Sequence, residues 1–93
     1  MIPVSKAVVT VLGIDCKGII AQVSNVLWQY NVNILDISQT IVDGYFNMIM
    51  IVDITTPSCS FDILNESLQK LGNDLHLQIR IQRSEIFEAM HQV

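Results

Sequence analysis

Positive charge is scarce in this 93-residue sequence. Five Lys or Arg residues stand against nine Asp or Glu residues, so the formal net charge is −4. The five cations are scattered along the chain, whereas a nucleic-acid-binding surface needs a basic cluster that contacts phosphates. We therefore expect no nucleic-acid partner.

Cysteine and histidine are also scarce, with two of each. Cys16 and Cys59 match neither a disulfide framework nor a metal motif, and we expect both to be reduced thiols. His76 and His91 are isolated, without the spacing of metal ligands. The carboxylates have no paired partner that would suggest a general acid or base. We therefore expect no metal, no cofactor, no catalytic residue and no enzyme activity.

Long apolar runs are absent, because Asp and Gly interrupt every apolar segment. This pattern excludes a bilayer-spanning helix, and the N-terminus lacks the features of a signal peptide. We expect a cytoplasmic protein with no membrane partner. Even so, 51% of the residues are apolar, which is a high fraction for a single domain over residues 1–93. Such a small monomer would expose much of this surface, so we expect a homodimer.

Apolar periodicity predicts four strands and two helices. The strands are expected at residues 4–12, 33–43, 45–54 and 75–83, and the helices at 18–30 and 61–72. Turn residues support these boundaries: Asp43-Gly44 is a strong hairpin signal, Asn31 and Gly72 are expected to end the helices, and Ser60 is a good N-cap. Residues 84–93 are predicted to form a short terminal helix that docks through Phe87 and Met90.

The first helix carries one apolar stripe at three- and four-residue spacing. Trp28 falls near the edge of this stripe, where it is either a core-rim residue or a dimer contact. The stripe is formed by Ile19, Ile20, Val23, Val26, Leu27 and Tyr30. The second helix carries a similar apolar stripe, formed by Phe61, Leu64, Leu68 and Leu71.

The order βαββαβ predicts an α+β, ferredoxin-like sandwich. Two right-handed crossovers give a four-stranded antiparallel sheet with both helices on one face. Strands 4–12 and 45–54 should be central. Strand 33–43 should lie at an edge, because Asp36, Ser38 and Thr40 form a polar face. The uncovered face, around Val8, Ile49 and Ile51, should be covered by a second copy or by the terminal helix.

The loop at residues 13–17 precedes the first helix and is flanked by glycines. Its unpaired N–H groups at a helix N-terminus could bind a small anion or carboxylate. Alternatively, Asp15 only caps the helix and Gly18 only permits close packing. Two other functions of this fold are disfavoured. An acylphosphatase needs an arginine in this loop, which offers only Lys17, and an RNA-recognition module needs several aromatic residues on the open face, where only Tyr45 qualifies.

Two segments carry a family resemblance: GIDCKGIIAQVSNVL at residues 13–27 and NVNILDISQTIVDGYFNMIMIVD at residues 31–53. With the element order, they make nearly the whole chain resemble an ACT domain. It is similar to the small stand-alone ACT proteins of bacteria and archaea, and through them to the glycine-cleavage repressor and the regulatory part of formyltetrahydrofolate deformylase. Two residues depart from the family pattern. Lys17 stands where many members have Pro, and Asn31 stands where many have Gly.

The resemblance implies a ligand site formed by the loop and the start of the second strand, usually at a dimer interface. The implied ligand-binding residues are Gly13, Ile14, Asp15, Cys16, Lys17, Gly18, Ile19, Asn33 and Ile34. It further implies a non-enzymatic regulatory domain that binds a small amino acid or related metabolite and signals to a metabolic or transcriptional partner. The alternative is a ligand-free interaction module that uses the open sheet face and the C-terminal tail.

Overall fold

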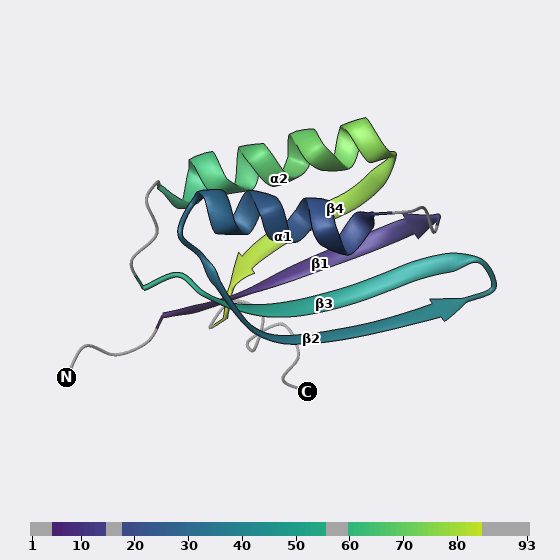
Figure 1. The fold of residues 1–93 in the computed structure, drawn as a ribbon, viewed down its shortest axis with the longest axis horizontal. Helices are drawn as coiled ribbons and strands as arrows, with labels where there is room; N and C mark the ends of the chain where they lie inside the picture. The colour runs from purple at the N-terminus through teal and green to yellow at the C-terminus, as the bar shows by residue number, and fades with distance from the viewer. Residues whose placement is uncertain (1–4, 15–17, 56–59, 85–93) are drawn as a thin grey trace.

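The computed structural model describes residues 5–14, 18–55 and 60–84, and six elements follow one another within them. Their order, βαββαβ, confirms the predicted one (Figure 1). The predicted terminal helix with Phe87 and Met90 lies outside the described residues. The elements are β1 (Lys6–Ile14), α1 (Ile19–Gln29), β2 (Asn33–Val42), β3 (Tyr45–Asp53), α2 (Phe61–Leu75) and β4 (Leu77–Arg83).

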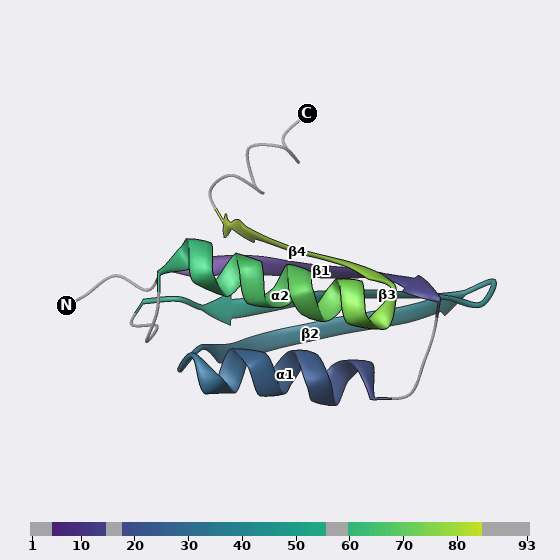
Figure 2. The same ribbon diagram turned by 90° about the horizontal axis from the view of Figure 1, so that it is seen from above.

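The four strands form one antiparallel sheet in the order β2-β3-β1-β4. β1 and β3 are central and β2 lies at an edge, as predicted. Both helices lie on the same face of the sheet (Figure 2). The α+β ferredoxin-like fold is therefore confirmed.

The core lies between the two helices and the covered face of the sheet. Val9, Met48 and Met50 of the central strands are fully buried there. From α1 the buried residues are Ile19, Val23 and Leu27, and from α2 they include Leu64 and Leu68. Most of each predicted stripe is therefore confirmed. Ile20 is an exception at 36% exposed, because it lies about 100° around the helix from Ile19.

Three predicted boundaries are confirmed. Asp43 and Gly44 both adopt positive φ, at 55° and 82°, and so form the tight turn between β2 and β3. Asn31, at φ 60°, follows the last turn of α1. The side-chain oxygen of Ser60 accepts a hydrogen bond from the backbone N–H of Ile63 at 3.3 Å and caps α2. Local turn and cap chemistry accounts for all three.

The predicted end of α2 is wrong. The helix continues through Gly72 to Leu75, and His76 ends it in the left-handed conformation at φ 57°. β4 therefore begins at Leu77 and not at residue 75. Gly72 has a packing role, since a Cβ atom there would lie 2.7 Å from the carbonyl oxygen of Leu77. It allows α2 to approach β4 closely instead of ending the helix.

β2 contains an irregularity near its start. Asn33 and Ile34 pair with Asp53 and Val52, but the register then shifts between Ile34 and Asp36. One residue, Leu35, is therefore left without a partner, as in a β-bulge. This shift decides which residues of β2 face the helices and which lie beside Asp53.

Candidate functional site

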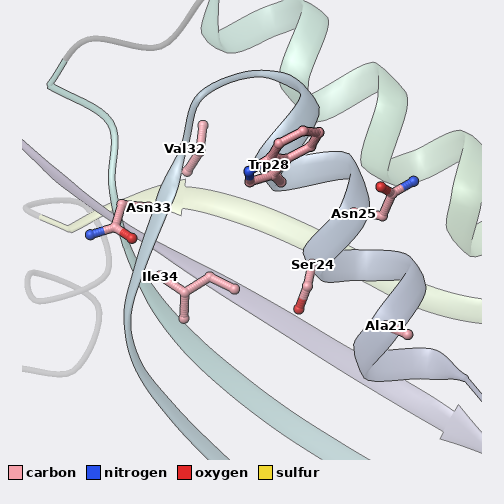
Figure 3. A pocket seen from close by; sticks show the side chains of 7 residues that line it. All are labelled: Ala21, Ser24, Asn25, Trp28, Val32, Asn33 and Ile34. Atoms are coloured by element: carbon pink, nitrogen blue, oxygen red, sulfur yellow. The ribbon is translucent and has the colours of Figure 1, made fainter.

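A groove of about 520 Å³ separates α1 from the start of β2. Seven side chains line it (Figure 3). Ser24 of α1 and Ile34 of β2 point toward the space between the two elements. The lining residues are Ala21, Ser24, Asn25, Trp28, Val32, Asn33 and Ile34.

The lining of this groove is uncharged. Ser24, Asn25 and Asn33 supply hydroxyl and amide groups, which both donate and accept hydrogen bonds. Trp28 is 79% exposed, although a tryptophan usually buries most of its ring. The predicted core-rim position of Trp28 is therefore wrong: its ring is largely in water beside the groove.

Asp53 is the cross-strand partner of Asn33, but it lies on the sheet face opposite the helices and does not line the groove. Thr55 donates two hydrogen bonds to the Asp53 carboxylate. One comes from its side-chain hydroxyl and the other from its backbone N–H, at 2.8 Å. These contacts, with Lys6 nearby, lower the pKa of Asp53 below its ordinary value of 3.8. Asp53 is thus an ionised acceptor beside Asn33. From the sequence alone Asp53 is a carboxylate without a paired partner, because its pairing with Asn33 depends on the bulge in β2.

The predicted site residues are distributed over two places. Asn33 and Ile34 line the groove, at the C-terminal end of α1. Gly13 and Ile14, at the end of β1, line a different hollow. Gly18 is the N-cap of α1 and Ile19 is buried in the core. Asp15, Cys16 and Lys17 lie outside the described residues.

Within one chain, Gly18 is the N-cap of α1, whereas Asn33 begins β2, which starts near the C-terminal end of α1 (Figure 1). An 11-residue helix is about 16 Å long, which is more than one amino acid can span. The fold therefore does not bring the helix N-terminus and Asn33 together in a single subunit.

Among the described residues, no side chain caps the N-terminus of α1. Gly18 has φ 81° and has no side chain to accept a hydrogen bond, and the first turn contains no acidic residue. The first hydrogen bond of the helix runs from the N–H of Gln22 to the carbonyl of Gly18. The N–H groups of the preceding residues have no acceptor within the helix, and this leaves a partial positive charge at its end.

The described residues contain no set of three or more His, Cys, Asp or Glu side chains that could hold a metal ion. None of their helices is long and apolar enough to cross a membrane.

Comparison with known proteins gives one consistent family. The ACT domain family model matches residues 5–82. A UPF0237 protein of Bifidobacterium longum is 53% identical over 89 residues, which cover 96% of this chain and 99% of the relative.

Solved structures agree with this assignment. An ACT domain protein from Streptococcus pneumoniae is 39% identical with a TM-score of 0.79, covering 96% of this chain and 100% of that one. A formyltetrahydrofolate deformylase from Pseudomonas syringae shares the fold, with a TM-score of 0.79 at 24% identity. The match covers 88% of this chain but only 28% of the deformylase. The chain belongs to the ACT-domain family and is a regulatory ligand-binding domain by that membership.

Proposed function

We propose that this protein binds a small amino acid or related metabolite at a homodimer interface. One observation carries the proposal. Asn33, at the start of β2, lies near the C-terminal end of α1 and therefore far from the N-terminus of that helix. An antiparallel, two-fold pairing of two β2 edges would place Asn33 of one subunit beside Gly18 of the other. The same operation completes two equivalent sites, as an isologous interface requires.

The exposed side chains on this flank support a dimer. Trp28, Leu35, Ile37 and Ile41 lie on α1 and β2 and are 79%, 45%, 40% and 61% exposed. As an edge strand, β2 also presents unpaired backbone groups along one side. Pairing two β2 strands satisfies these groups and removes apolar surface from water.

The chemistry of the completed site suits an amino acid. Its carboxylate would accept hydrogen bonds from the N–H groups at the start of α1 in one subunit. Its ammonium would donate to the Asn33 side-chain oxygen of the other subunit. The uncharged groove would hold the remainder of the ligand.

Regulation then follows from assembly. A ligand that contacts both subunits favours the dimer by its differential affinity for that state, and the dimer would pass the signal to a metabolic or transcriptional partner. In this proposal the domain performs no chemical step and contributes no catalytic residue.

The test is a thermal-shift screen of amino acids and related metabolites on purified protein, with sedimentation velocity for each hit. A binder at 100-fold excess over its Kd adds about 2.7 kcal/mol to stability and raises the melting temperature. Asn33→Ala should abolish the shift. Asn73→Ala, which changes an exposed amide on α2, is the matched control and should retain it.

Two results would overturn the proposal. One is the absence of a shift with every compound. The other is a ligand that raises the melting temperature of wild type and Asn33→Ala equally, which would place its site elsewhere.

A further inference from the structure

We propose that half of the open sheet face is a second ligand site, for a small organic anion that carries a planar ring. The open face is the side of the sheet opposite the helices. Its hairpin half is the part nearest the Asp43–Gly44 turn. This site does not depend on the dimer interface proposed above.

The strand register places the residues of the hairpin half in three rows across β3, β1 and β4. The first row contains Tyr45 and Ile14. The other two rows are Asn47–Leu12–Gln78 and Ile49–Thr10–Arg80. Side chains in adjacent strands of one row lie about 5 Å apart at their Cβ atoms, so the three rows form a continuous surface.

The hairpin half of the face is exposed. Leu12 and Ile49 are each 43% exposed, Tyr45 is 54% exposed and Ile14 is 70% exposed. Val8, on the same face toward the other end of β1, is only 3% exposed. Exposed contiguous apolar surface of this kind usually marks a binding site.

The surface is also hollowed. One hollow of about 310 Å³ is lined by residues that include Thr10, Asn47 and Arg80, and a second of about 310 Å³ by residues that include Ile14, Tyr45 and His76. Leu12 and Gln78 line both, so the two hollows adjoin along β1.

Polar groups stand at defined places around this apolar floor. Arg80 is the one cation of the three rows, and its cross-strand neighbour is Thr10 rather than a carboxylate. The carboxylates on the described open face, Asp36 and Asp53, lie in rows outside the hairpin half. Asn47 and Gln78 place side-chain amides between Arg80 and Tyr45.

These positions define the ligand. Thr10 and Ile14 are four positions apart on β1, so their two rows lie about 14 Å apart along the strand. An anionic group would bind the Arg80 guanidinium, the ring would stack near Tyr45, and the amides would bond to polar atoms between them. The size and chemistry suit a nucleoside monophosphate or an aromatic carboxylate. A polynucleotide does not fit, because it needs several cations and the chain has a net charge of −4.

The experiment is a titration of isotope-labelled protein followed by NMR, with AMP and phenylpropionate as the two probes. Adenosine and inorganic phosphate, each alone, test the ring and the anion separately. We expect shifts at Leu12, Asn47 and Gln78, and weaker binding of either half than of AMP. Binding by AMP alone, or by phenylpropionate alone, identifies the anion as phosphate or carboxylate.

Three variants give the decisive comparison. Arg80→Gln should weaken AMP binding about tenfold or more, because it removes a charge-assisted hydrogen bond. Asn47→Asp should weaken it by repelling the anion, without removing apolar surface. Lys70→Gln makes the same charge change as Arg80→Gln at an exposed position on α2 and should leave binding unchanged.

The proposal fails if neither probe shifts these signals at millimolar concentration, or if Lys70→Gln weakens binding as much as Arg80→Gln. It also fails if Arg80→Gln and Asn47→Asp change only the oligomeric state, since the face would then be a contact between copies. A loss of amino-acid binding at the α1–β2 groove affects none of these results, so the two proposals are tested separately.

Discussion

The phenol oxygen of Tyr30 lies 2.9 Å from the hydroxyl oxygen of Ser67. This hydrogen bond joins the C-terminal end of α1 to α2 above the sheet, and both side chains are partly buried. This bond therefore contributes to holding α1 in place beside the groove.

Tyr30→Phe should therefore lower the free energy of unfolding by about 0.5–1.5 kcal/mol, because it removes the bond and keeps the ring. Urea denaturation measures the change. Ser67→Ala and the double variant complete a mutant cycle, which isolates the coupling between the two hydroxyls. A coupling energy near zero would show that the bond does not stabilise the fold.

Gly72→Ala should destabilise the protein by about 1–3 kcal/mol, the usual range for overpacking. Alanine favours a helix over glycine by about 1 kcal/mol, but the new Cβ would lie 2.7 Å from the carbonyl oxygen of Leu77. Thermal or urea unfolding tests this balance. Asn73→Ala, one residue further along the helix and exposed, should be nearly neutral or stabilising. Equal effects of the two substitutions would contradict the close approach of α2 to β4.

Asp53 should make stability depend on pH in the acid range. Its folded-state pKa is lowered by the bonds from Thr55, so the carboxylate stabilises the fold above its unfolded pKa. That contribution is lost as pH falls from the ordinary value of 3.8 through the lower folded value. Unfolding free energies measured from about pH 5 to pH 2 should fall more steeply for wild type than for Asp53→Asn.

The cause of this acid dependence can be tested at Thr55. Thr55→Ser keeps the hydroxyl and should keep the wild-type profile. Thr55→Ala removes the hydroxyl bond but keeps the backbone N–H bond, so its profile should lie between those of wild type and Asp53→Asn. Parallel profiles for all four proteins would mean that Asp53 titrates as it does in the unfolded chain.

Trp28 is the single tryptophan, so its fluorescence reports on the α1–β2 flank. If two copies pair along this flank, dilution should shift the emission to longer wavelength and increase quenching by acrylamide, because dissociation returns the ring to water. Ile37→Lys, which places a charge on the edge strand, should show the dissociated spectrum at every concentration. Emission that is independent of concentration in both proteins would exclude this flank as the dimer contact.

The sequence by itself determined the elements and their order. Alternation of period two and a repeat of three to four residues are properties of a strand and a helix, and they require no knowledge of distant neighbours. The Asp43–Gly44 turn, the Ser60 cap and Asn31 were equally predictable. Each depends on bonds or backbone angles within a few residues.

Gly72 shows where local reasoning failed. From the sequence, a glycine near the end of an apolar repeat is a good helix terminator. Its actual position depends on the carbonyl of Leu77, which approaches it only after β4 folds back beneath α2. The helix instead ends at His76, which adopts the left-handed conformation. Nothing in the local sequence favours His76 over Gly72 as the residue that ends the helix.

The tertiary structure alone decided the composition of the candidate site. Counted from the Asp43–Gly44 turn without a bulge, Asp53 would pair with Ile34. The register shift after Ile34 instead places it opposite Asn33. The direction of α1 then sets Asn33 and Gly18 at opposite ends of the helix. Strand register and helix direction arise from long-range packing. The sequence therefore identified candidate site residues, but it could not predict which of them lie close together.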